Sequence, residues 1–274
     1  MAGIAVVTDA STCLPPALAA DLDIRILPIS GTGELDQLEG DAGAAWRLPE
    51  EVEQAELNAA NRPFVTEYLA AIEGPGVDAA VVVAPAIEFA AMFRNAVLAT
   101  ELADRPAVAI DGRTAAAGQA LVVLAGAEAA RCGGSLDDVV RAIQHASHRV
   151  ELVASLATLD PIRRNGPLPE AVLEGPVRSG MRAVFRMRAG TIEMLEDAED
   201  AEDSLETIHQ AYLKAGADTV ERCTVFHAGA PDLAAHLERL LGRVDFVCGF
   251  STAMQVHTGR GVVGAAWLAG GEPR

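Results

Sequence analysis

The chain has 274 residues, of which 50% are hydrophobic and 4% aromatic, a composition typical of a globular protein whose core is built from small aliphatic side chains. Its 39 acidic and 21 basic residues give a formal net charge of -18, which argues against binding to nucleic acid or to anionic membranes. The chain begins without a signal-like segment and contains no apolar stretch of roughly 18 residues, so we expect a cytoplasmic protein with no membrane insertion.

The first half of the chain alternates short apolar strands with helices. Strands are expected over residues 4–7, 24–30, 78–86 and 107–112. Helices are expected over residues 14–22, 63–72, 87–102, 114–131 and 135–150. Ser135 is the expected N-cap of the last helix, with Asp138 three residues on. This order predicts an N-terminal α/β lobe with a mostly parallel sheet and flanking helices, which we assign to residues 1–150.

The pattern changes in the second half, residues 151–274. Two expected strands over 181–195 are joined at Ala189-Gly190, which indicates hairpin pairing. The acidic run 196–203 is expected as the solvated start of an amphipathic helix. The remaining expected strands cover residues 151–159, 223–229, 245–251 and 262–269, with a helix over 230–242. We therefore predict a C-terminal α/β lobe with a mixed or antiparallel sheet.

The segment VHTGRGVVG has glycines at the G-x-G-x-x-G spacing of dinucleotide-binding loops, at Gly259, Gly261 and Gly264. That fingerprint needs a helix after it and an acidic residue about 20 positions on, whereas only ten strand-like residues follow Gly264. We instead expect a turn before the last strand. Its amides, with the His257 imidazole and the Thr258 hydroxyl, could face an anion in a cleft.

Other site chemistries have little support in the sequence. The chain lacks a phosphate-loop G-K-[ST], a G-x-S-x-G elbow and a C-x-x-C pair. His145 and His148 have no further ligands placed to complete a metal shell. We expect no catalytic residue, no metal and no cofactor. A hydrolase that uses a strand-end hydroxyl, such as Ser11 or Ser251, stays an open alternative.

Five segments, taken in order, resemble the DegV family of fatty-acid-binding proteins, and together they span residues 4 to 268. They are IAVVTDASTCLPPALA, VAIDGRTAAAGQA, LATLDPIRRNGPL, VFHAG and VHTGRGVVG. The resemblance implies two lobes with a long-chain acyl ligand in a pocket between them, and no enzymatic activity. It also implies a possible partner, because some bacterial members present the bound acid to a kinase that phosphorylates its carboxylate.

The resemblance also suggests which residues bind the ligand. His257, Thr258 and Gly259 fall on the family's closing motif, and we carry the head-group role to them. Thr114 stands at a hydroxyl position of the family's strand-then-helix segment, and Arg113 beside it is a candidate cation.

The chain departs from the family where hydroxyl donors are expected. Asn58 and Asn61 are the nearest polar residues to the position of a Thr-Ser-Gln-Pro-Ser loop, and Ala90-Ala91-Met92 replaces a Ser-Gly-Thr turn. A buried carboxylate loses roughly 1 to 3 kcal/mol for each missing partner. The ligand is therefore different, bound more weakly, or held by another group, with Arg113, Arg163 and Arg182 as candidates.

A second departure concerns partners. Pro167 stands where the family has an arginine, and the acidic run 196–203 stands where it has a basic patch. A kinase that docks on a basic surface is not expected to dock on this one. The alternative function is an interaction or regulatory protein with the same fold and a degenerate ligand site.

Overall fold

The computed structural model describes residues 3–30, 36–38, 63–87, 91–161 and 181–270. Several residues that the resemblance singles out lie outside these ranges: Asn58, Asn61, Ala90, Arg163 and Pro167.

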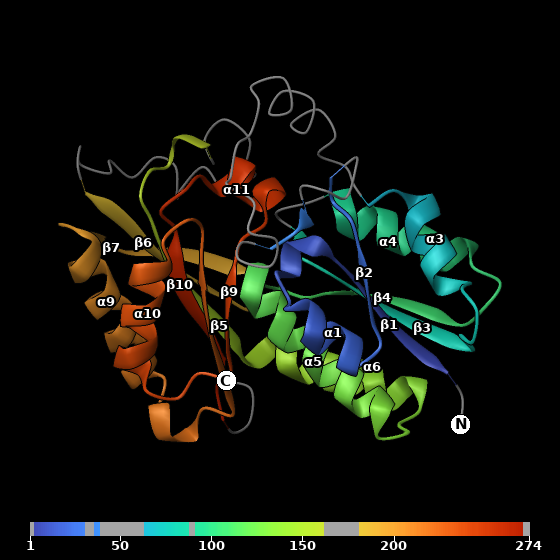
Figure 1. Cartoon of the computed structure of the whole chain (residues 1–274). Helices are drawn as coiled ribbons and strands as arrows, with labels where there is room; N and C mark the ends of the chain where they lie inside the picture. Colours follow the sequence, from blue (N-terminus) through green and yellow to red (C-terminus); the bar gives the residue numbers. More distant parts are fainter. Residues whose placement is uncertain (1–2, 31–35, 39–62, 88–90, 162–180, 271–274) are drawn as a thin grey trace.

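The N-terminal lobe is built on a parallel sheet of order β2-β1-β3-β4. Its strands are β1 (Ile4–Asp9), β2 (Ile24–Leu27), β3 (Ala79–Ala84) and β4 (Ala107–Asp111). Every residue of β3 is buried, as expected of a central strand covered on both faces. The helices α3 (Val65–Ile72) and α4 (Ala91–Leu102) cover one face (Figure 1). A short 3-10 helix, η1 (Ala10–Thr12), and then α1 (Pro16–Asp21) follow β1.

The C-terminal lobe has a mixed sheet of order β7-β6-β5-β10-β8-β9, in which β8 and β9 are parallel and the other pairs antiparallel. Its strands are β5 (Val150–Leu156), β6 (Arg182–Arg188), β7 (Thr191–Ala198), β8 (Arg222–His227), β9 (Phe246–Gly249) and β10 (Val263–Leu268). The helices α9 (Ala201–Lys214) and α10 (Pro231–Leu241) pack on one face, and η4 (Ala217–Thr219) follows α9. Both expected sheet types are confirmed, as is the hairpin at Ala189-Gly190.

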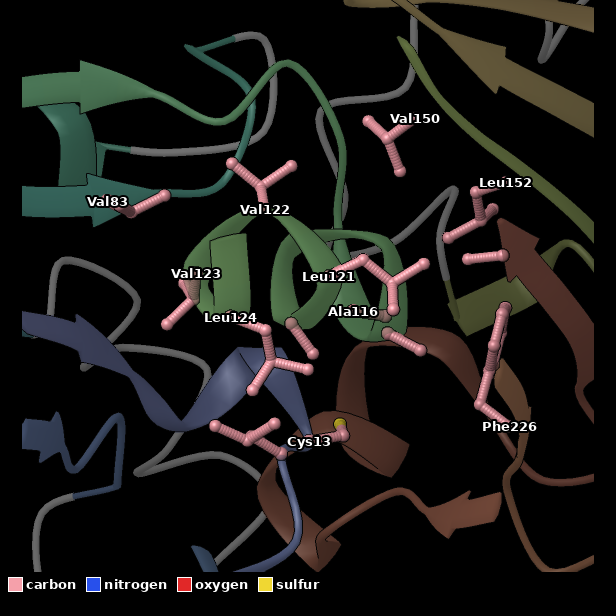
Figure 2. Packing of buried hydrophobic residues seen from close by; sticks show 14 of the residues in the cluster. Cys13, Val83, Ala116, Leu121, Val122, Val123, Leu124, Val150, Leu152 and Phe226 are labelled. Carbon is pink, nitrogen blue, oxygen red and sulfur yellow. The ribbon is translucent and has the colours of Figure 1, made fainter. Parts of the chain in front are cut away.

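Two long helices, α5 (Ala116–Arg131) and α6 (Leu136–Arg149), lie between the two sheets (Figure 1). Figure 2 shows Leu121 and Leu124 of α5 among Val83 of the first sheet and Leu152 and Phe226 of the second. These residues belong to one hydrophobic cluster that includes strands of both sheets. The two lobes are therefore joined by a continuous core.

Helix α6 begins as the sequence predicts. The Ser135 hydroxyl accepts a hydrogen bond from the Asp138 amide at 3.3 Å, and the Asp138 carboxylate accepts one from the Ser135 amide at 2.9 Å. These bonds from Ser135, helped by Arg141, lower the pKa of Asp138 to about 2.

The turn before the last strand and the acidic start of a helix are both present in the C-terminal lobe, and each differs from the expectation in one detail. The turn expected before the last strand is preceded by a helix, α11 (Thr252–Thr258), whose N-cap Ser251 accepts a hydrogen bond from the Met254 amide at 3.3 Å. His257 therefore lies in the last turn of a helix, because the caps at Ser251 and Gly259 enclose a helix-forming segment. The acidic run also begins earlier than the helix: Glu196 lies on β7, and Asp200 is the N-cap of α9.

Candidate functional site

Helix α11 joins the C-terminal lobe to the N-terminal lobe through an apolar contact, which we call the α11 seam. It consists of Ala10 and Ile29 of the N-terminal lobe, Ala253 and Met254 of α11, and Met92 of α4. Met92 belongs to the segment where the resemblance implies a hydroxyl-bearing turn. A methionine side chain has no hydrogen-bond donor, and here it packs in an apolar cluster.

A cavity of about 710 Å³ lies beside the seam. The lining is mostly apolar and comes from η1, α1, β2 and nearby loops: Ala10, Thr12, Cys13, Leu14, Pro16, Ala19, Ala20, Ile24, Ile26, Pro28, Asp36, Gln37 and Leu38. All of these residues belong to the N-terminal lobe, whereas the resemblance implies a pocket between the lobes. Ala10 and Ile26 line the cavity and also belong to the cluster that contains Ala253. The cavity thus adjoins the contact between the lobes.

The cavity has one carboxylate in its lining, and that group already has donors. Asp36 accepts hydrogen bonds from the Ile29 amide at 3.1 Å and from the Ser30 amide at 3.0 Å. Its oxygens are thereby occupied in holding the chain after β2. The rest of the lining is suited to an apolar ligand segment.

His257 lies in the last turn of α11 and is partly buried. Burial lowers the pKa of its imidazole, so the ring is neutral at pH 7. No other residue in the described part of the chain forms a hydrogen bond with the ring. A neutral imidazole offers one N–H donor and one acceptor, so His257 can bind a polar ligand end with one hydrogen bond of either kind.

The neighbouring donors are used within the protein. The Thr258 hydroxyl lies 3.1 Å from the Met254 carbonyl and 3.2 Å from the Gly259 carbonyl, and its single proton serves one of them. The Gly259 amide donates to Gln255 at 2.8 Å, and the Gly261 amide donates to Ala228 at 2.6 Å. These two amides do not face an anion, contrary to the arrangement proposed from the sequence.

Gly259 instead has a clear structural reason to be glycine. Its φ is +75°, and a Cβ atom there would lie 2.8 Å from Cγ of Pro161. The glycine lets the chain leave α11 in close contact with the segment after β5.

Arg113 and Thr114 follow β4, and they lie apart from the end of α11. The Arg113 carbonyl accepts a hydrogen bond from the Gly190 amide at 2.8 Å, at the turn between β6 and β7. The opposite end of β6 contacts Gly261 through Arg182. Since the seven residues of β6 span about 20 Å, Arg113 and His257 are not brought together at one carboxylate.

Thr114 is fully buried, and its hydroxyl has no hydrogen-bond partner among the described residues. Unpartnered buried hydroxyls are uncommon in folded proteins because each one loses its hydration. Thr114 therefore stays a candidate for contact with a ligand, at a place separate from His257.

A buried polar network lies at the end of β1. The sequence does not predict it. Asp9 accepts hydrogen bonds from the Ser11 amide at 3.0 Å, from the Ser11 hydroxyl, and from the Gln119 side chain at 3.3 Å. Burial raises the pKa of the Asp9 carboxyl, and the hydrogen bonds from Ser11 and Gln119 oppose that shift. The network joins η1 to α5. A short polar segment after a strand gives no sign of a partner more than a hundred residues away.

The hydroxyls considered for hydrolysis have structural roles. Ser11 hydrogen-bonds to Asp9 and Gln119, and Ser251 caps α11. In the described part of the chain, neither is hydrogen-bonded to a histidine that could act as its general base. The described residues also contain no group of three or more His, Cys, Asp or Glu placed to hold a metal ion. No helix among them is long and apolar enough to cross a membrane.

Comparison with known proteins gives consistent results. A family model described as "Uncharacterised protein, DegV family" matches residues 3–270. A DegV domain-containing protein of Mycobacterium tuberculosis is 28% identical over 281 residues, covering 98% of this chain and 99% of the relative. One from Streptomyces coelicolor is 26% identical, covering 95% and 96%.

Solved structures share the fold. DegV, described as a fatty acid binding protein from Bacillus subtilis, superimposes with a TM-score of 0.79 at 21% identity, covering 98% of this chain and 100% of that one. A DegV family protein from Corynebacterium glutamicum gives a TM-score of 0.78 at 20% identity, covering 99% and 98%. A stearic-acid-binding protein from Eubacterium ventriosum gives 0.76 at 16% identity, covering 98% of both chains.

Proposed function

The chain belongs to the DegV family, and from that premise we propose that it is a cytoplasmic, non-enzymatic protein that binds a long-chain fatty acid. The observation that carries the proposal is the apolar cavity of about 710 Å³ beside the α11 seam. Two solved relatives support the ligand class, since one is described as binding stearic acid and another was solved with vaccenic acid.

The cavity suits the apolar part of such a ligand. Its volume falls within the range of small-molecule pockets, and each methylene transferred from water contributes about 0.8 kcal/mol. The polar end of the acid lies on the side of the seam, where Ala10 and Ile26 border both the cavity and α11. We assign this end to His257 in the last turn of α11, whose neutral imidazole offers a hydrogen bond.

Binding without catalysis agrees with the roles of the hydroxyls. Ser11 is part of the buried network with Asp9, and Ser251 is occupied as a helix cap. A hydrolase needs a nucleophile hydrogen-bonded to a base, and neither serine has one in the described residues. The protein acts, in this proposal, by holding the acid rather than by changing it.

Filling the cavity tests the proposal. Ala20 lines the cavity from an exposed position of α1, so Ala20→Trp places an indole in the ligand's path while leaving the core intact. We expect the affinity for palmitate, measured by displacement of a fluorescent fatty acid, to fall at least about tenfold, the loss of several methylene contacts.

The matched control is Ala17→Trp, an exposed position of the same helix that does not line the cavity. It should bind palmitate as the original chain does. Equal affinities in both tryptophan variants would show that the acid does not occupy this cavity.

We extend the proposal to presentation of the bound acid to a fatty acid kinase, which the family resemblance supports. Glu199 and Asp200 are exposed at the start of α9, so a partner that docks there must carry a basic surface. The competing hypothesis is an interaction protein with a degenerate site. It predicts partner binding that does not depend on added fatty acid.

A further inference from the structure

The end of α11 has few hydrogen-bond donors left for a ligand. Thr258, Gly259 and Gly261 direct their hydrogen-bond donors to carbonyls of the protein itself. His257 is neutral and offers a single hydrogen bond. A carboxylate that leaves water needs several donors or a positive charge, so these residues alone do not hold it.

Arg182 begins β6 and contacts the loop that follows α11. Its Nε–H donates to the Ser155 hydroxyl at 2.8 Å, and its Nη2 donates to the Gly261 carbonyl at 2.5 Å. Both acceptors are neutral. A guanidinium has five N–H groups, so three of them have no acceptor in the described part of the chain.

The charge of Arg182 is also not compensated by any residue that the structure describes. Arg186 on the same strand forms ion pairs with Glu193 and with Glu151, the latter at 3.3 Å. Arg182 forms no ion pair with a described residue, although the chain has a formal net charge of -18. Burial lowers the pKa of its guanidinium. A partly buried unpaired cation gains from binding an anion.

Helix α11 lies between the seam and the loop that Arg182 contacts. Ala253 of the seam lies at the start of α11, and Gly261 follows the end of that helix. The seven residues of α11 span about 10 Å. Helix α11 thus connects the seam, which borders the cavity, with the loop that Arg182 contacts.

We propose that Arg182 supplies the positive charge that holds the carboxylate of the bound acid, with its free N–H groups as donors; this inference rests on the proposed function. Arg182 thereby takes the place of the hydroxyl donors that the family resemblance implies and that this chain lacks in the described part of the site. The residue makes the site selective for acids over uncharged lipids of equal length.

The test compares palmitate with hexadecanol, which has the same chain length and no charge. In Arg182→Gln, we expect affinity for palmitate to fall about tenfold to a hundredfold, the usual effect of losing a hydrogen bond to a charged group. Affinity for hexadecanol should change less than about twofold. The control Arg186→Gln removes a paired arginine from the same strand and should leave the ratio of the two affinities unchanged.

Arg182→Lys distinguishes the effect of the positive charge from the effect of the hydrogen bonds to Ser155 and Gly261. Lysine keeps the charge and lacks the planar guanidinium that makes both bonds. It should retain most of the preference for palmitate, and it decides the question if the glutamine variant does not fold. An unchanged preference in Arg182→Gln would overturn the role of Arg182 while leaving fatty acid binding intact. Loss of the preference in Arg182→Lys would contradict the positive charge as the basis of that role. If the original chain binds neither lipid, the proposed function itself fails.

Discussion

Two buried threonines of the N-terminal lobe differ in their hydrogen bonds. The Thr8 hydroxyl donates to the Val83 carbonyl at 2.9 Å and accepts from the Gln119 side chain at 3.0 Å. The Thr114 hydroxyl is equally buried and has no hydrogen-bond partner in the part of the chain that the structure describes. The first hydroxyl therefore stabilises the fold, whereas the second costs stability unless a ligand contacts it.

Valine, which has the same shape as threonine, distinguishes the two roles. Thr8→Val should lower the free energy of unfolding by about 1 to 3 kcal/mol, because it leaves buried groups without partners. Thr114→Val should leave the free energy of unfolding of the ligand-free protein unchanged or raise it. Urea denaturation of delipidated protein measures both. A loss in Thr114→Val as large as that in Thr8→Val would mean that the Thr114 hydroxyl has a structural partner.

For individual residues, the sequence indicates which ones lie near the site but not which hydrogen bonds their side chains form. The closing motif directs attention to His257 and Thr258, yet the Thr258 hydroxyl turns back to a carbonyl of its own helix. Sequence spacing also cannot show that Arg113 and Arg182 lie at opposite ends of β6. Hydrogen-bond direction depends on rotamers and tertiary contacts, which residue types do not specify.

Helix α11 determines the position of the site at the scale of secondary structure. It packs Ala253 on the N-terminal lobe, and it ends at Gly259 against Pro161. Gly242 ends α10 at a similar φ of +77°, but a Cβ atom there would meet nothing within 4 Å. The two glycines share an unfavourable φ for other residues, and only Gly259 adds a steric contact.

Gly259→Ala should therefore cost more than Gly242→Ala. We expect the former to lower the free energy of unfolding by about 1 to 3 kcal/mol beyond the latter, the range of an overpacked contact. Chemical denaturation of both variants gives the difference. Equal losses would show that the contact with Pro161 relaxes without cost and does not fix the end of α11.

Most elements could be predicted from the sequence, because their apolar patterns are long. The run that forms β3 and the capped, amphipathic α6 are examples. The apolar pattern does not predict α11, because seven residues are too few to show a helical period. Ser251 and Gly259 nevertheless carry the expected capping signals. The sequence predicts the acidic run as the start of a helix, whereas in the structure the border between β7 and α9 falls within the run.

At the scale of the whole molecule, α5 and α6 between two sheets make one core out of two lobes. The sequence predicts two α/β lobes and their sheet types, because parallel and hairpin-paired strands leave different patterns. It does not locate the cavity, which is lined by the N-terminal lobe and bordered by the α11 seam. That position depends on how the lobes pack, which local patterns do not encode.

The central claim, that this chain carries a long-chain fatty acid, is tested most directly by native mass spectrometry of the purified protein, followed by identification of the released lipid. The account predicts one acyl acid for each chain, lost on denaturation and depleted in Ala20→Trp relative to Ala17→Trp. A protein that carries no lipid, and that takes up none after incubation with a series of saturated and unsaturated long-chain acids, would contradict it.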